Sequence, residues 1–268
     1  MRGSYLLAGQ PSEMERLRLQ SRVWEPAGRQ LLSQLAPRRF SGGRVLDVGC
    51  GALSWLRILS KWVGPSGRVV GTDIDQNLLD AAGSFLEAEG ISNVDLVIDD
   101  LFESKLEVQS FDLVHARFQI APLGRGRDQV ASHRRLVKPG GWLVLEEWDM
   151  ASWHFNPPAP AAERLIRLLY EIFTLGGEAG RELPALLREI GIADPAIDAH
   201  MIALKPGHPY LRLPLQFSVA LERRLLQMGS ADELASLRRE AEAELSDPAR
   251  WGTTFALVQS WGRVEGGG

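Results

Sequence analysis

Residues 44–54 read RVLDVGCGALS, and the rest of the chain is organised around this stretch. Arg44 to Val48 is typical of a buried parallel strand, because apolar and β-branched residues surround a single acid, Asp47. Gly49-Cys50-Gly51 predicts a sharp turn, and the amphipathic segment from Leu53 to Val63 predicts a helix. Glycine lets a ligand approach the backbone closely. A strand, a Gly-x-Gly turn and a helix N-terminus are typical of the ligand-binding cradle of a doubly wound sheet.

The following hundred residues alternate between short apolar runs and amphipathic segments. Further strands are predicted at Arg68 to Thr72, Val94 to Ile98, Phe111 to Ala116 and Trp142 to Glu146, with helices at Gln76 to Glu89 and up to Arg135. This alternation indicates a parallel sheet with right-handed crossovers. Two later strands, at Ala196 to Leu204 and Thr253 to Arg263, complete the prediction. We expect an α/β fold with a doubly wound (Rossmann-like), mostly parallel seven-stranded sheet and helices on both faces.

Helical segments precede and follow this alternation. Residues 12–35 carry spaced apolar residues and predict one or two amphipathic helices, interrupted near Pro26. A rigid connector, Asn156 to Pro160, precedes helices predicted at Ala161 to Leu175 and Pro184 to Ile190. We therefore expect residues 1–40 to form an N-terminal helical lid. Residues 41–268 are expected to form one domain, with a helical insertion at about 206–250 before the last strand.

The composition of the chain limits the kinds of partner and site that we expect. The 268 residues carry a formal net charge of −4, so no overall attraction to nucleic acid or an anionic membrane is expected. The single cysteine, Cys50, excludes an internal disulfide, and no Cys/His spacing is typical of zinc. The N-terminal apolar run is too short for a signal peptide, and no segment is long enough to cross a bilayer. A cytoplasmic protein with a small-molecule partner is expected, and a homodimer is left open.

Acidic residues near the strand ends indicate what the cradle holds. The turn departs from the dinucleotide fingerprint at Ser54, where a third glycine is required. Asp47 precedes the turn, Asp73 ends the second strand and Asp100 ends the third. A pyrophosphate would be repelled by this series. A nucleoside ligand with a cationic end fits it better.

Over residues 44–150 the chain resembles the class I S-adenosylmethionine-dependent methyltransferases of the small-molecule type. The motifs that carry the resemblance are VLDVGCG at 45–51, VVGTDID at 69–75, DD at 99–100, FDLVHARF at 111–118 and LVKPGGWLVLEE at 136–147. The pattern from Tyr5 to Gln20 is also similar to the helical lid of many small-molecule members. The resemblance implies an enzyme that uses S-adenosyl-L-methionine as its cofactor.

The resemblance also implies how the methionine part of the cofactor is bound. Gly49 and Gly51 would let the methionine part approach the backbone closely, and Asp47 would support its ammonium group. Ala116 would place its carbonyl near the same ammonium group. Asp47 has a competing interpretation, since it could simply cap local backbone amides.

For the nucleoside part, the resemblance implies roles at the ends of the second and third strands. Asp73 would accept both ribose hydroxyls, and Ile74 would lie against the adenine face. Asp100 would accept from the adenine amino group, while the Leu101 N–H serves a ring nitrogen. The neighbouring acids Asp75 and Asp99 could hold the roles of Asp73 and Asp100 instead.

Methyl transfer is an in-line displacement, so proximity and alignment can supply most of the acceleration. A general base is needed only when the acceptor must lose a proton. The candidates are His154, which follows the fifth strand, and His115, whose strand position could turn it away from the cofactor. His154 could instead be bonded to the connector. Many relatives carry a histidine where this chain has Pro122, so no base is carried over to that position.

The acceptor side is predicted from aromatic residues near the fourth and fifth strand ends. Phe118, Trp148, Trp153 and Phe155 are expected to line a pocket for a flat or apolar acceptor, although a role in the core competes. Glu146, Glu147 and Asp149 could suggest a metal, but the fourth strand offers His115 rather than an acid, and no metal is expected. Asn156-Pro157-Pro158 resembles a nucleic-acid adenine methylation motif, but it follows the wrong strand.

Three other functions compete with methyl transfer. A nicotinamide-dependent oxidoreductase shares the opening architecture, but Ser54, Asp47 and the Pro-Gly-Gly motif before the fifth strand disfavour it. A protein of the methyltransferase fold could bind the cofactor without turnover. Such a protein could also catalyse a different reaction, such as a cyclisation or a decarboxylation.

Overall fold

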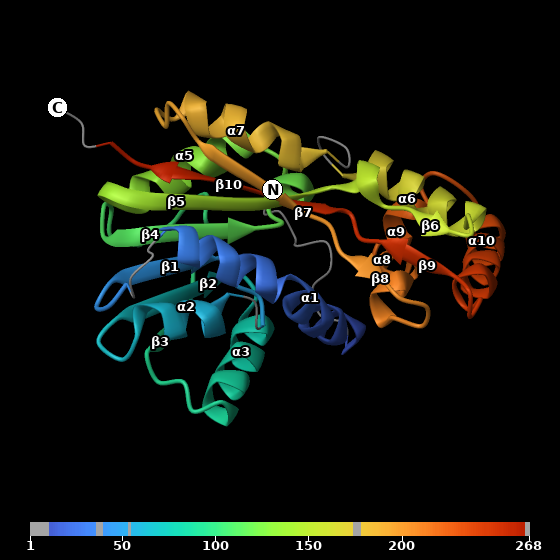
Figure 1. The fold of residues 1–268 in the computed structure, drawn as a ribbon, viewed down its shortest axis with the longest axis horizontal. Coiled ribbons are helices and arrows are strands. Elements are labelled where there is room, and N and C mark those ends of the chain that lie inside the picture. Colours follow the sequence, from blue (N-terminus) through green and yellow to red (C-terminus); the bar gives the residue numbers. More distant parts are fainter. Residues whose placement is uncertain (1–10, 36–39, 53–54, 174–177, 266–268) are drawn as a thin grey trace.

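The computed structural model describes residues 11–35, 40–52, 55–173 and 178–265 (Figure 1). A seven-stranded sheet forms its centre, in the order β3-β2-β1-β4-β5-β10-β7. Its strands are β1 (Arg44–Val48), β2 (Arg68–Asp73), β3 (Val94–Ile98), β4 (Phe111–Arg117), β5 (Val137–Asp149), β7 (Ala196–His200) and β10 (Ala256–Arg263). Strands β1 to β5 pair in parallel, and β10 runs antiparallel to both β5 and β7. The predicted mostly parallel, seven-stranded α/β sheet is confirmed.

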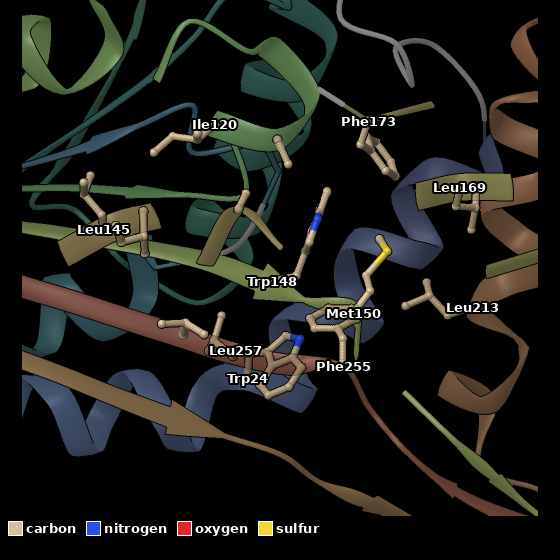
Figure 2. Close-up of a cluster of buried hydrophobic side chains, with 14 of the residues drawn as sticks. Trp24, Ile120, Leu145, Trp148, Met150, Leu169, Phe173, Leu213, Phe255 and Leu257 are labelled. Carbon is tan, nitrogen blue, oxygen red and sulfur yellow. The ribbon is translucent and has the colours of Figure 1, made fainter. Parts of the chain in front are cut away.

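Strand alternation gives the core two large clusters, one on each face of the sheet. Val45, Leu113 and Val144 pack with helices α1 (Pro11–Leu35), α2 (Leu56–Val63) and α3 (Gln76–Ala88). The alternate residues Leu46 and Val114 belong to a larger cluster with α5 (Gly126–Leu136) and α7 (Ala179–Glu189). Burial on both faces explains why these strands read as nearly continuous apolar runs. Figure 2 shows how the larger cluster continues from β5 to aromatic residues near the strand ends.

Helix α1 is continuous through Pro26, so the predicted interruption there is wrong. A proline inside a helix removes one hydrogen bond and costs about 3 kcal/mol. Trp24 and Leu31, on either side of the proline, are completely buried. The Trp24 indole N–H also donates to the Tyr210 hydroxyl at 3.0 Å. Tertiary packing therefore overrides the local signal.

A helical region lies beyond one end of the sheet (Figure 1). It contains α6 (Pro160–Ile172), α8 (Leu213–Ala220), α9 (Glu222–Leu225) and α10 (Ala231–Leu245), together with a small sheet of β6 (Phe155–Asn156), β9 (Trp251–Thr253) and β8 (Ala203–Leu204). Helix α6 packs on α10, so this region also includes chain from before position 206. Three short helical elements lie between the longer ones: α4 (Ile120–Leu123) follows β4, η1 (Met150–Ser152) follows β5, and η2 (Pro209–Arg212) precedes α8.

Two predicted strands have different bounds in the structure. The segment predicted as one strand from Ala196 to Leu204 is divided, because β7 joins the large sheet and β8 joins the small one. The last strand begins at Ala256 rather than Thr253, because Thr253 is the last residue of β9. Sequence periodicity cannot show that an extended segment changes sheets. Within the described ranges, every helix is too short or too polar to traverse a lipid bilayer.

Candidate active site

A cavity of about 490 Å³ lies at the carboxyl ends of the parallel strands. Its size is typical of small-molecule sites, and its place is where open α/β sheets bind ligands. The predicted site residues that line it are Gly49, Gly51, Asp73, Ile74, Asp100, Leu101, Phe118 and Trp148. Helices α1 and α8 also contribute lining residues, so the cavity has walls from both the sheet and the helical segments.

The turn after β1 requires both of its glycines. Gly49 and Gly51 have φ angles of 59° and 56°, which lie in the left-handed region that favours glycine. A Cβ on Gly49 would lie only 1.9 Å from the side-chain nitrogen of Gln119. That Gln119 amide donates to the carbonyl of Val48 at 2.5 Å. Among the residues that the structure describes, a Cβ on Gly51 would meet only Leu17, at 3.9 Å, which leaves space for a ligand beside Gly51.

Asp73 is held at the end of β2 by two backbone donors. The N–H of Gly51 donates to one carboxylate oxygen and the N–H of Asp75 to the other, each at 3.0 Å. Burial raises the pKa of Asp73, and these donors oppose the rise. Each oxygen keeps a second lone pair, so the carboxylate suits a ligand diol. Asp75 instead caps helix α3 by accepting from the Asn77 N–H at 2.9 Å and does not line the cavity.

The acids at the end of β3 both line the cavity. Asp100 accepts from the Phe102 N–H at 2.9 Å, and Asp99 accepts from the Lys105 N–H at 3.1 Å. These local bonds fix the loop that follows β3. The geometry leaves both acids as candidates for contact with a ligand.

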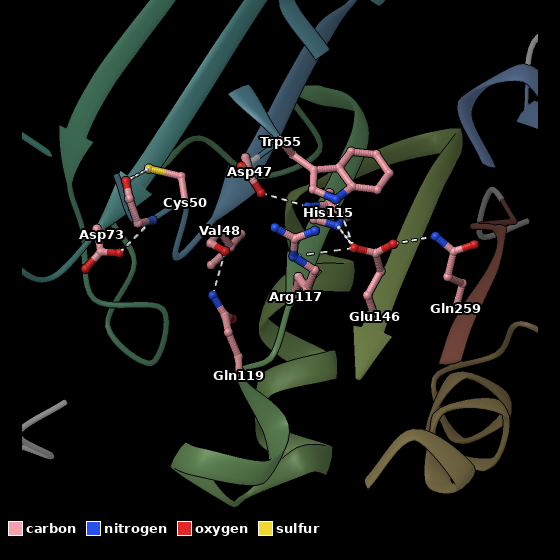
Figure 3. Close-up of polar contacts among 11 residues, drawn as sticks. Asp47, Val48, Cys50, Trp55, Asp73, His115, Arg117, Gln119, Glu146 and Gln259 are labelled. Atoms are coloured by element: carbon pink, nitrogen blue, oxygen red, sulfur yellow. Dashed lines mark hydrogen bonds and ion pairs between the residues drawn. The ribbon is translucent and has the colours of Figure 1, made fainter. Parts of the chain in front are cut away.

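Asp47 and His115 belong to a buried polar network rather than to the cavity wall (Figure 3). His115 Nδ1 lies 2.7 Å from Asp47 Oδ1, and its Nε2 lies 3.2 Å from Glu146 Oε2. The imidazole stacks on Trp55 with ring centroids 3.8 Å apart. Glu146 also accepts from the Trp55 indole at 2.9 Å and from the Gln259 amide. Neither Asp47, predicted to support a ligand ammonium group, nor His115, one of the two base candidates, therefore lines the cavity.

Charges within this network shift the pKa values of its members. Burial alone would lower the pKa of His115, but the hydrogen bonds and charges of Asp47 and Glu146 raise it. Burial alone would raise the pKa of Glu146, but His115, Arg117 and Gln259 lower it. The network therefore favours an imidazolium between two carboxylates. Its physical role is to join β1, β4, β5 and β10 across the sheet.

Four other predicted residues also lie away from the cavity. His154 is exposed, Ala116 is buried, and neither lines the cavity, so the remaining base candidate and the predicted carbonyl contact are not supported. Trp153 and Phe155 are buried in the core. Trp153 packs against Phe255 with ring centroids 5.7 Å apart. The competing interpretation of these two aromatics as core residues is the one that the structure favours.

The acceptor side of the cavity is formed by aromatic residues that are far apart in the sequence. Phe118 stacks on Trp148 with centroids 5.2 Å apart, and Phe173 lies 5.0 Å and Phe217 6.4 Å from the same indole. Phe118 has a φ of 57°, an unusual conformation for a residue with a side chain. Its N–H donates to the Glu146 carbonyl at 2.9 Å, which holds the ring in place. Sequence analysis missed Phe173 and Phe217, as well as Arg16, Gln20, Arg117 and Gln119, all of which line the cavity.

Glu147 lies on the opposite face of β5 from Glu146 and anchors the short helix α4. Its Oε1 accepts from the Ile120 N–H at 2.6 Å, and burial raises the pKa of Glu147 to about 8 although backbone donors oppose the rise. Pro122 and Leu123 of α4 line the cavity. A neutral carboxyl group therefore supports one wall of the site.

This pKa predicts a pH-dependent stability. The folded-state pKa of about 8 exceeds the unfolded value of roughly 4.3. The folded state binds the extra proton, so the free energy of unfolding falls as pH rises through that window. Glu147→Gln removes this titration and keeps an oxygen for Ile120. Between about pH 6 and about pH 9, urea unfolding should show the parent losing a few kcal/mol relative to Glu147→Gln. A difference that is constant over this range would contradict the assignment.

Comparison with known proteins agrees with this geometry. Residues 45–141 match the family model described as "Methyltransferase domain". A demethylmenaquinone methyltransferase from Geobacillus kaustophilus is 27% identical over 182 residues, which cover 62% of this chain and 78% of that protein.

Two solved structures share the fold. The YcgJ protein from Bacillus subtilis superimposes with a TM-score of 0.56 at 17% identity, covering 88% of this chain and 98% of that one. Phosphoethanolamine N-methyltransferase 2 from Haemonchus contortus, solved with phosphomonomethylethanolamine and S-adenosylhomocysteine, gives a TM-score of 0.54 at 17% identity. That match covers 88% of this chain and 51% of the Haemonchus chain.

The sheet order, the glycine turn and the acid at the end of β2 define a nucleoside-binding α/β fold of the methyltransferase type. Together with the matched family domain, they make the protein a class I S-adenosylmethionine-dependent methyltransferase. The cofactor of this class is S-adenosyl-L-methionine.

Proposed function

We propose that the protein transfers a methyl group from S-adenosyl-L-methionine to a small aromatic or apolar acceptor by in-line displacement. The observation that carries the proposal is a single cavity with two different ends. Asp73 and Asp100 line one end, and the cluster of Phe118, Trp148, Phe173 and Phe217 lines the other. The first end suits a nucleoside with a cationic group, and the second suits a flat, apolar acceptor.

The residues at the first end fit the cofactor by their donors and acceptors. The open backbone at Gly49 and Gly51 would meet its methionine part, and Asp73 would accept from the ribose hydroxyls. Ile74 is half exposed beside Asp73 and would cover the adenine face. Asp100 and the Leu101 N–H would bind the adenine edge. Asp47 would act indirectly, by holding His115.

The chain contributes position and shelter to the reaction. When bound, the cofactor supplies an activated methyl group on a sulfonium. The aromatic cluster would orient the acceptor in line with that methyl group, and such alignment can lower the barrier by about 7–11 kcal/mol. Helices α1 and α8 would exclude water from above the strand ends. The described residues that line the cavity include no histidine, so the acceptor would react through an atom that needs no histidine base.

The absence of a histidine among the described lining residues also bears on which atom of the acceptor receives the methyl group. An oxygen or nitrogen acceptor that is already nucleophilic would react without a protein base. A second candidate is a quinone-like ring, which is favoured by the relative named demethylmenaquinone methyltransferase. An alternative of a different class is a protein that binds the cofactor and catalyses another reaction or none.

Methyl transfer is tested by incubating the protein with S-adenosyl-L-methionine labelled in the methyl group. Phenol, amine, carboxylate and quinol acceptors would be supplied in parallel, and label would be counted after extraction of the products. The proposal predicts label in an aromatic product. Binding of the cofactor without label in any product would favour the alternative.

We also propose that residues 1–40 act as a lid and that the helical insertion at about 206–250 covers the acceptor side. Arg16, Leu17 and Gln20 of α1 line the cavity, as does Phe217 of α8. The remaining part of α1 is anchored by Trp24 and Leu31. The segment from Tyr5 to Gln20 lies partly outside the described residues, which begin at position 11.

Deletion of residues 1–20 should leave a folded protein whose turnover collapses and whose cofactor exchanges faster, because the deletion removes one wall of the cavity. Stopped-flow dissociation of S-adenosylhomocysteine and circular dichroism would measure these two properties. The substitution Arg29→Gln, at an exposed position further along α1, is the matched control and should change neither. Normal turnover in the truncated protein would exclude the lid.

A further inference from the structure

The indole N–H of Trp148 is a hydrogen-bond donor on the wall of the cavity. Trp148 is the last residue but one of β5, lines the cavity and is only 5% exposed. Within the described ranges of the chain, its Nε1 has no hydrogen-bond partner. A buried donor that is left unpaired lowers the stability of the fold. Two other buried indoles, those of Trp24 and Trp55, each donate to an oxygen, at 3.0 Å and 2.9 Å. The unpaired donor of Trp148 therefore requires an explanation.

The aromatic side chains around this indole do not supply an acceptor. Phe118 stacks on it with ring centroids 5.2 Å apart, and Phe173 lies at 5.0 Å (Figure 2). Phe217 and Phe255 lie at 6.4 Å and 6.2 Å. Phenyl rings carry no oxygen or nitrogen, and their faces are at most weak acceptors. An acceptor for the N–H can instead come from the cavity, which Trp148 lines.

In the part of the chain that the structure describes, the cavity wall contains one other polar side-chain atom that is buried without a partner. This atom is Oε1 of Gln119. The Gln119 amide lies beside the glycine turn, where its nitrogen donates to the Val48 carbonyl at 2.5 Å. Gln119 is therefore next to the proposed cofactor site, whereas Trp148 lies within the aromatic cluster. Of the two unpaired groups, Trp148 is the one that an acceptor would meet.

We propose that the Trp148 indole N–H donates a hydrogen bond to an oxygen of the acceptor, so that the substrates of this enzyme are flat apolar molecules bearing a carbonyl or hydroxyl oxygen. This inference rests on the proposed function, because it narrows the substrate class of the same site. The ring of Phe118 would hold the apolar body of the acceptor, and the N–H would fix its orientation. Trp148 would determine specificity and take no part in bond making. Such a site rejects an analogue that lacks the oxygen, because the buried donor then stays unpaired.

The test compares 2-acetylnaphthalene with 2-isopropenylnaphthalene, which has nearly the same shape and carries a CH₂ group in place of the carbonyl oxygen. Each is titrated by calorimetry into protein saturated with S-adenosylhomocysteine. The ratio of ketone affinity to alkene affinity should be about 10-fold higher in the parent than in Trp148→Phe, because this variant keeps an aromatic ring and loses the N–H. Comparing the two ratios cancels the difference in hydration between the probes.

Trp153→Phe is the matched control. The Trp153 indole N–H is also buried and unpaired among the described residues, but Trp153 does not line the cavity. The same substitution at this position should leave the parent's ratio of affinities unchanged. An equal loss in both variants would overturn the inference, because the preference would then arise from the packing of the core.

Nuclear magnetic resonance gives a second readout, which a purely structural role of Trp148 would not move. The parent is labelled with nitrogen-15 and saturated with S-adenosylhomocysteine, and the indole N–H signal of Trp148 is assigned through its connection to the Trp148 backbone. The ketone should move the indole proton to lower field, as a new hydrogen bond does, and the alkene should not. The indole signal of Trp153 should not distinguish the two probes. This measurement provides the result if Trp148→Phe does not fold.

The affinity for S-adenosylhomocysteine alone is measured first in every protein. Failure of the parent to bind it would contradict the proposed function itself. The inference is overturned if the parent and Trp148→Phe show the same ratio of affinities, or if the parent binds neither probe measurably. It is also overturned if the ketone leaves the indole proton of Trp148 where the alkene does, since another group of the cavity wall would then meet the oxygen.

Discussion

Asp73→Ala should weaken the binding of S-adenosylhomocysteine by about 10²–10⁴-fold. On the proposed role of Asp73, the variant would lose two charge-assisted hydrogen bonds to the ribose, each contributing about 1.5–3 kcal/mol. It also frees the N–H groups of Gly51 and Asp75, which the carboxylate holds at 3.0 Å. Calorimetric titration measures the affinity, and circular dichroism checks the fold.

Asp75→Ala is the matched control, because it removes a carboxylate only two residues away. Asp75 caps α3 and does not line the cavity. Its loss should lower the free energy of unfolding by about 1 kcal/mol and leave the cofactor affinity unchanged. If Asp75→Ala loses the affinity and Asp73→Ala keeps it, the ribose assignment is wrong.

His115→Leu should lower the free energy of unfolding by about 3–5 kcal/mol, because it leaves Asp47 and Glu146 buried without the cation between them. A loss of that size is a large part of the stability of an ordinary domain. Urea unfolding, monitored by circular dichroism, measures the effect. His154→Leu, at an exposed position, should change stability by less than about 0.5 kcal/mol.

A second variant separates a structural role from a catalytic one. Adding Asp47→Asn to His115→Leu should restore part of the lost stability, since one buried charge is removed. Unchanged stability in His115→Leu, together with a lost alkaline or acidic limb in the pH profile of turnover, would instead identify His115 as a base.

The fold could be predicted from sequence because its signals are local. The strand of Arg44 to Val48, the turn at Gly49 to Gly51 and the acid at Asp73 lie within short, strongly patterned segments. Positive φ at both glycines follows from the same sharp turn. The places of Asp73 and Ile74 in the cavity wall follow because parallel strands end at one edge.

The polar network could not be predicted, because it depends on which side chains meet across the sheet. Asp47, His115 and Glu146 come from three strands, and each occupies an alternate position whose face the sequence does not reveal. Trp55, which stacks on His115, comes from the turn before α2. Because Asp47 and His115 are buried in this network, neither of these two predicted site residues lines the cavity.

The acceptor wall depends on contacts at long sequence separation. Phe118 and Phe217 are about one hundred residues apart, yet both pack around Trp148. An aromatic residue on an apolar helix gives the same sequence signal whether it lines a core or a cavity. Trp153 and Phe155 show the opposite outcome, since a run that predicted a pocket is buried in the core.

The most direct test of the central claim is a calorimetric titration of the parent protein with S-adenosylhomocysteine, followed by the same titration with a nicotinamide dinucleotide. The cavity with Asp73 and Asp100 at one end should bind S-adenosylhomocysteine with a stoichiometry near one per chain and the dinucleotide not measurably. Tight binding of the dinucleotide, or no binding of S-adenosylhomocysteine by folded protein, would contradict the account.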